Sequence, residues 1–404
     1  MMGRDCRGGA RPRGRGGSRA TAVLLSILGF GCAPWEHSLT RAPFIIHTNG
    51  EAGRLPPIAA RAAFICGVYE DLFGLQTAAL GPLEIIDTVP AGEVRVGTLD
   101  PGSYEGRSRR IVLRDTPDDE LLLHEIAHHF IRGLRERTAP WINEGLAVYL
   151  AWSAVGEEEI APGGLPIHHV QEVVELAACR RLRPLSVLTG LRPADFYTEV
   201  EEQRTRNYSE AWAAVYFLVE EALPREPMPR RLRSLLAMTP SQVAALEERY
   251  ERFWRKFDIL AELKSRLSSS KALERHLAAI LLGIVGDPHA IPPLMHLASK
   301  QDESRSVRLA ALRGVGTILL QIGVTDFTWG EDQLRDSLQR LMGEEDPAVA
   351  ELSTRLRVAV RTWDRGTFLT EFAIALVADP VYPSRTYARM RKPAEGPSPR
   401  AQDL

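Results

Sequence analysis

The sequence predicts an α+β chain in which a small sheet is followed by packed helices and then by helical repeats. The short apolar runs that predict strands lie before residue 115, and apolar residues at helical spacing dominate from there to about residue 264. A related apolar pattern then returns at a spacing of 32 residues. The 404 residues, 45% hydrophobic and 25% charged, suit a globular protein of two or three domains.

Residues 1–32 have the layout of a targeting segment. Six arginines precede residues 21–30, which are uncharged and mostly apolar. Crossing a bilayer takes about 20 apolar residues, so this run matches a signal-peptide core instead. Gly31 and Cys32 follow, as in a bacterial lipoprotein cleavage box, although Gly29 replaces the preferred aliphatic residue. We expect export to the bacterial cell envelope, with Cys32 as a lipid anchor in the membrane; an ordinary signal peptide and an unprocessed N-terminus are the alternatives.

Charge and cysteine content narrow the function classes. The formal net charge of −2 argues against a strongly basic nucleic-acid binder, so no nucleic-acid partner is expected. Beyond the targeting segment only Cys66 and Cys179 remain. Export would permit a disulfide between them, and two buried thiols are the alternative. The chain has no CxxC pair, so a thiolate metal site is not predicted.

The first elements combine strands with one helix. A linker is expected over residues 33–42, and residues 92–106 are Gly-rich and turn-like, with a short strand at 94–96 as an option. A helix is expected over residues 57–73, ended by Gly74. Three apolar runs predict strands, at residues 43–48, 83–89 and 110–113.

Two helices follow in close succession. Thr116 can cap the first, Pro117 suits its first turn, and this helix is expected to end near Gly133. The second begins near Pro140 and runs through Leu150. Further helices are expected to residue 264, interrupted by Pro-rich loops.

Residues 271–378 carry the returning apolar pattern. Leu277-Ala-Ala and Leu309-Ala-Ala lie 32 residues apart, and a weaker copy begins at Asp346. Paired helices at this period resemble HEAT-type repeats, which would present a surface to a protein partner. An ordinary helical bundle is the alternative. Residues 380–404 are expected to be disordered.

The motif His124-Glu125-Ile126-Ala127-His128 is the strongest chemical signal. The two histidines stand at i and i+4 of a predicted helix, so both imidazoles project from one face and can bind the same Zn²⁺. Glu125 lies one residue further round, near the metal rather than under it. That place suits a carboxylate that takes a proton from an activated water.

A second motif opens the next predicted helix, with the sequence Trp141-Ile-Asn-Glu144-Gly-Leu-Ala. Together the two motifs resemble those of the gluzincin metallopeptidases and of the smaller peptidase MA-like families. The resemblance covers about residues 43–223 and implies a zincin-type domain, placed here at residues 43–264, with a small mixed sheet and active-site helices. It implies one Zn²⁺ held by His124, His128 and Glu144, with Glu125 as the general base.

Three further features near the motifs have a functional and an ordinary structural interpretation. Related families carry a tyrosine near the position of Tyr208 that could stabilise an oxyanion, whereas packing is its ordinary role. The strand at residues 110–113 would hold substrate by strand addition at a sheet edge, or would be a plain sheet strand. Glu120 is a candidate to orient a ligand histidine. His129 faces away from the ligands, and the pair His168-His169 is expected in a surface loop.

These observations predict a zinc-dependent hydrolase of peptide or protein substrates. Zinc would polarise the scissile carbonyl, and Glu125 would take a proton from the attacking water and deliver it to the leaving amine. One alternative is an inactive metallopeptidase fold that acts as an envelope scaffold through its repeats. Another is a zinc hydrolase of non-peptide amides.

Overall fold

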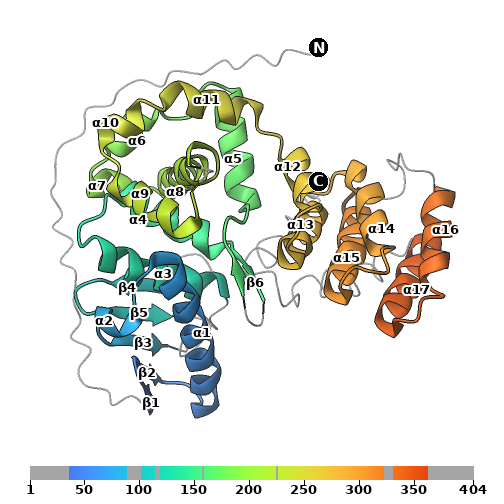
Figure 1. Ribbon diagram of the computed structural model, residues 1–404, viewed down its shortest axis with the longest axis horizontal. Helices are drawn as coiled ribbons and strands as arrows, with labels where there is room; N and C mark the ends of the chain where they lie inside the picture. Colours follow the sequence, from blue (N-terminus) through green and yellow to red (C-terminus); the bar gives the residue numbers. More distant parts are fainter. Residues whose placement is uncertain are drawn as a thin grey trace, which may run out of the picture. The chain divides into compact units, whose positions relative to one another are not determined.

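The computed structural model describes residues 36–88, 102–113, 119–156, 159–223, 226–322 and 331–362 (Figure 1). The predicted α+β class is confirmed, since one small mixed sheet precedes a long series of helices. The predicted targeting segment with Cys32, the optional strand at 94–96, the caps Thr116 and Pro117 and the predicted disordered tail lie outside the described residues.

The main sheet has five strands in the order β1-β2-β3-β5-β4. Its three central strands are parallel, and antiparallel strands flank them on both sides. The central strands are the three that the apolar runs predict. The strands are β1 (His37–Arg41), β2 (Phe44–Thr48), β3 (Leu83–Asp87), β4 (Gly102–Glu105) and β5 (Arg110–Leu113).

The two flanking strands correct the sequence interpretation. β1 occupies the expected linker, and β4 occupies part of the stretch expected to be turn-like. Both carry polar or glycine residues and little apolar alternation, so the signal for a half-buried strand is absent from them. Pairing with β2 and β5, rather than their own composition, makes them strands.

Three helices form the packed centre beside the sheet (Figure 1). They are α3 (Asp119–Leu134), α4 (Pro140–Ala151) and α8 (Glu201–Tyr216). α4 packs against both of the others, and Gly145 allows the close approach to α8. A Cβ on Gly145 would lie only 2.7 Å from the carbonyl carbon of Ala211. The backbones of α4 and α8 therefore meet at this point without a side chain between them.

Other elements surround this centre. α1 (Leu55–Phe73) contacts both α3 and the sheet, and it ends as predicted at Gly74, whose φ of 65° is the left-handed conformation of a helix C-cap. A short hairpin of β6 (Ala154–Val155) and β7 (Ile160–Ala161) follows α4. The remaining helices of this part are α2 (Thr77–Leu80), α5 (Ile167–Ala178), α6 (Leu185–Thr189), α7 (Pro193–Phe196), the π-helix η2 (Phe217–Ala222), α9 (Met228–Ala237), α10 (Pro240–Ala244), α11 (Glu247–Lys256) and α12 (Ile259–Arg266).

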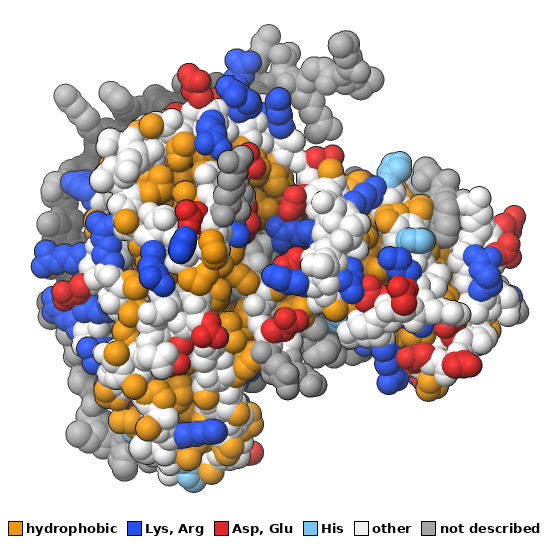
Figure 2. Space-filling model, viewed as in Figure 1, with side chains coloured by type: hydrophobic (Ala, Val, Ile, Leu, Met, Phe, Trp, Pro, Cys, Tyr) orange, Lys and Arg blue, Asp and Glu red, His pale blue; other side chains and the backbone are white. Residues whose placement is uncertain are grey.

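The C-terminal helices pack in a regular series. α13 contacts α15, and α15 contacts α17, with α14 and α16 beside them. Gly283 and Gly314 let α13 and α15 approach, because a Cβ on Gly283 would lie 2.8 Å from the Cα of Gly314. Acidic and basic side chains are interspersed over these helices in Figure 2. They are α13 (Ala272–Val285), α14 (Ile291–Ala298), α15 (Arg305–Ile322), α16 (Glu331–Leu341) and α17 (Pro347–Thr362).

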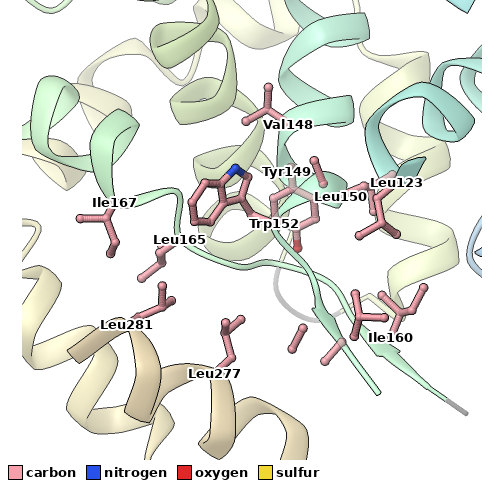
Figure 3. Close-up of a cluster of buried hydrophobic side chains, with 14 of the residues drawn as sticks. Leu123, Val148, Tyr149, Leu150, Trp152, Ile160, Leu165, Ile167, Leu277 and Leu281 are labelled. Carbon is pink, nitrogen blue, oxygen red and sulfur yellow. The ribbon is translucent and has the colours of Figure 1, made fainter. Parts of the chain in front are cut away.

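One hydrophobic core continues from the centre into the C-terminal helices. Figure 3 shows Leu277 and Leu281 of α13 beside Leu165 and Ile167, close to Trp152 at the end of α4. All five side chains are buried. Among the described residues, no helix combines the length and the apolar character that crossing a bilayer requires.

Candidate metal centre

Helix α3 brings the two motif histidines together. Its other faces bury apolar side chains such as Leu123 and Ile126, which fixes the rotation of the helix against the core. His124 and His128 then share the remaining face, with ring centroids 4.8 Å apart and Nε2 atoms 3.1 Å apart. The i, i+4 prediction is therefore realised in the described helix.

Helix α4 supplies the third group. Pro140 starts this helix directly after the short turn that follows α3, and α4 returns along α3. The Oε2 atom of Glu144 lies 3.5 Å from Nε2 of His124 and 3.4 Å from Nε2 of His128. Among the described residues, these three side chains form the group that could hold a metal ion.

The separations of the three ligand atoms fit a small tetrahedral ion. Zinc bound to nitrogen and oxygen at about 2.0–2.1 Å in a tetrahedron places its ligand atoms about 3.3–3.4 Å apart. The observed separations are 3.1, 3.4 and 3.5 Å. Two imidazoles and one carboxylate are also a usual donor set of catalytic zinc. The residues present therefore fit a zinc ion.

Glu144 and His128 shift each other's pKa. Burial by itself would lower the pKa of His128, but the carboxylate of Glu144, and then that of Glu125, raise it to about 9. Burial would raise the pKa of Glu144, yet His128 and His124 hold it well below its usual range. Both side chains are almost fully buried. A buried carboxylate beside two imidazoles is an environment that favours a cation.

The second oxygen of Glu144 is held by two donors. The hydroxyl of Tyr197 donates to Oε1 at 2.8 Å, and Nδ2 of Asn143 donates to the same atom at 3.0 Å. Tyr197 is the residue that the sequence interpretation missed. It stands 53 residues after Glu144 at the end of the short helix α7, and no spacing pattern connects the two.

Tyr208, the tyrosine expected near the site, lies on α8. It is half-buried, and its ring packs beside Phe196 with centroids 5.7 Å apart. This contact is the packing that was its alternative role. Its role toward an oxyanion stays a prediction.

Glu125 lies at the junction of α3 and the sheet. It is 5% exposed, and its Oε1 lies 3.3 Å from the place that a Cβ on Gly102 would occupy. Gly102 opens β4, and the side chain of Leu121 lies still closer to that place, with its Cδ1 at 2.6 Å, so a residue with a Cβ would not fit between β4 and α3. The proposed base thus lies next to the first residue of an edge strand.

The edge of the sheet differs from the expectation. The strand at residues 110–113 is β5, which pairs with β3 on one side and β4 on the other, so its backbone groups are already used. It is the plain sheet strand of the two alternatives, and β4 is the edge strand that contacts α3. Tyr104 of β4 stacks on His128, with centroids 6.3 Å apart.

His129 of α3 contacts the edge strand β4 through Tyr104. Its Nδ1 atom is 3.1 Å from the hydroxyl of Tyr104, and burial, with a further contribution from Arg109, lowers its pKa to about 4. It is not part of the three-residue metal group, in keeping with its expected direction. Glu120 is half-buried one turn before His124, and its orienting role stays a prediction.

The pair His168-His169 lies in helix α5, not in a surface loop. His168 is exposed, but His169 is buried, and its Nδ1 is 2.7 Å from Oγ of Ser209, which donates to Glu172. Burial lowers the pKa of His169, and the rings of His168 and His124 lower it further. The surface expectation was wrong for His169 because α5 packs on α8 at this position.

Both described cysteines are free thiols. Cys66 is buried in α1, as expected of a structural thiol, and burial raises its pKa to about 12. Cys179 is exposed at the end of α5, so neither the disulfide nor the pair of buried thiols is found.

Comparisons of the chain with known proteins identify no relative that would assign the site. A scan of family models, a search of curated proteins and a search of solved structures each found no match.

Proposed function

We propose that this chain is a zinc-dependent peptide hydrolase of the gluzincin type. The observation that carries the proposal is the convergence of three side chains, the half-buried His124 and the buried His128 and Glu144, at separations that suit zinc. The neighbouring Glu125 and the edge strand β4 support it, because a hydrolase also needs a base and a place for its substrate.

The residues of the chain divide the work of hydrolysis. When bound, zinc would supply a Lewis acid that polarises a carbonyl and makes a water more acidic. The carboxylate of Glu125 would accept the proton of the attacking water and pass it to the leaving amine. The outer edge of β4, which pairs with no other strand among the described residues, would hold an extended peptide by backbone hydrogen bonds.

The rest of the chain supports a larger role in the cell envelope. The proposed zincin-type domain covers residues 43–264, and the helices from α13 onward are proposed to be HEAT-like repeats that offer a surface to a protein partner or a large substrate. Each repeat would bury its apolar face against the next, as α13, α15 and α17 do. Export and lipid attachment at Cys32 are proposed from the N-terminal segment.

The decisive experiment replaces the base and leaves the ligands. Glu125→Gln should keep one bound zinc per chain and lose hydrolysis of a peptide library by at least about 100-fold. His124→Ala should lose the zinc itself. Glu175→Gln, which changes an exposed carboxylate on α5, is the matched control and should retain both properties.

The same measurements separate the alternatives. A wild-type chain that binds zinc but cleaves no peptide, while its C-terminal helices capture a protein, would favour the scaffold function. Cleavage of simple amides but not of peptides would favour a non-peptide amidase. One zinc per chain in the His124→Ala variant would contradict the ligand assignment.

Lipid attachment has its own test. Cys32→Ser should move the chain from the membrane fraction to the soluble fraction of the envelope. A variant that stays with the membrane would contradict the anchor without affecting the proposed chemistry.

A further inference from the structure

We propose that Tyr197 is a positioning residue for the metal ligand Glu144, and that Asn207 holds Tyr197 in place. This inference rests on the proposed function, because it takes Glu144 as a ligand. It gives Tyr197 a role in holding the ligand, which is separate from the oxyanion role predicted for Tyr208.

The first step concerns the two oxygens of Glu144. Oε2 faces His124 and His128, at 3.5 and 3.4 Å, whereas Oε1 accepts hydrogen bonds from Tyr197 and Asn143. A carboxylate can bind a metal through one oxygen or both, and it rotates freely unless it is held. Two donors on Oε1 keep that atom away from the metal and leave Oε2 as the single ligand atom.

The second step concerns what is special about Tyr197. Asn143 precedes Glu144 on the same helix, so its donor moves with the ligand. Tyr197 comes from a different segment and is therefore the contact that fixes Glu144 relative to the rest of the site. The residue as a whole is 43% exposed, and replacement by phenylalanine removes only its hydroxyl.

The third step concerns how Tyr197 is held. Asn207 of α8 is fully buried, and its Nδ2 donates to the carbonyl oxygens of Phe196, at 2.8 Å, and of Asp195, at 3.2 Å. These are the two residues before Tyr197. Its Oδ1 accepts in turn from Arg183 at 3.0 Å.

Asn207 therefore ties the end of α7 to α8, the helix against which α4 packs. The Asn-Tyr-Ser-Glu stretch within α8 contributes to the site through its asparagine. Helix α8 thus holds both parts in place: α4, which carries Glu144, packs against it, and Asn207 of α8 bonds to the segment that carries Tyr197.

The test is the affinity for Zn²⁺ of the full chain stripped of metal, measured by competition with a chromophoric chelator. Tyr197→Phe keeps the ring and removes the donor, and it should weaken zinc binding about 10–100-fold. Tyr216→Phe is the matched control, since its hydroxyl also donates to a carboxylate, that of Glu262, outside the metal group, and it should bind zinc as the wild type does. Equal affinity of Tyr197→Phe and wild type would overturn the inference.

A second readout reports the coordination directly. With Co²⁺ in place of zinc, Tyr197→Phe should change the position and intensity of the visible absorption bands, because Oε1 becomes free to bind. Unchanged bands would contradict the role of Tyr197 even if affinity fell. A wild-type chain that takes up no Zn²⁺ would instead refute the proposed function itself, so the two failures are distinguishable.

Discussion

A methyl group on Gly145 should disturb both the stability of the chain and its proposed metal site. The residue follows the proposed ligand Glu144 on α4, where that helix crosses α8. In Gly145→Ala the new Cβ would overlap the carbonyl oxygen of Ala211 and lie 2.7 Å from its carbonyl carbon and 2.9 Å from Val215. Backbone forms most of this obstacle, so a change of rotamer cannot relieve it.

The size of the effect follows from these distances. Ordinary contact begins at 3.4 Å, and the added Cβ would lie 2.7 Å from the carbonyl carbon of Ala211 and closer to its oxygen, so α4 and α8 must move apart by at least about 0.7 Å. Overpacking of this kind costs roughly 1–3 kcal/mol, which exceeds the gain of about 1 kcal/mol from replacing a helical glycine by alanine. Glu144 moves with α4, whereas metal sites tolerate ligand displacements of only about 0.2 Å.

Denaturant unfolding of the metal-free chain and a zinc competition titration measure the two consequences. Gly145→Ala should lower the free energy of unfolding and weaken zinc binding together. Gly67→Ala is the matched control, because Gly67 is exposed on α1 and a Cβ added there would meet no atom within 4 Å, and it should stabilise the chain by roughly 0.5–1 kcal/mol. A Gly145→Ala chain as stable as the wild type would refute the reasoning.

The remaining predictions concern buried titratable groups. A thiol reagent should label Cys179 in the folded chain and Cys66 only after unfolding, because Cys66 is buried and its pKa is raised to about 12; peptide mapping identifies the sites, and rapid labelling of Cys66 would contradict its burial. Burial lowers the pKa of His129 from 6.5 to about 4, so the unfolded chain binds a proton that the folded chain does not. The free energy of unfolding should therefore fall as the pH is lowered from about 6.5 toward 4, by at most roughly 3 kcal/mol from this group. His129→Gln should remove that part of the pH dependence in denaturant titrations, and an unchanged dependence would show that other groups cause it.

Much of the site was predictable from short-range patterns. The histidines of α3 are four residues apart, and helix geometry alone places them on one face. The apolar runs predict β2, β3 and β5, whereas β1 and β4 carry no such pattern and become strands through pairing. Of the two alternatives for residues 110–113, the structure therefore gives the plain sheet strand, and the edge beside Glu125 belongs to β4.

The sequence by itself determined the α+β class, the two histidines that share one face of α3 with their neighbouring carboxylate, and the short turn after which Glu144 follows. These features depend on residues close together in the chain, where backbone geometry and apolar periodicity dominate. Only the tertiary structure decided that Glu144 reaches both histidines, that Tyr197 holds its second oxygen, that His169 is buried and that Cys179 is exposed. Those outcomes arise where α4, α5, α7 and α8 pack, because contacts between distant segments are set by how whole helices fit together.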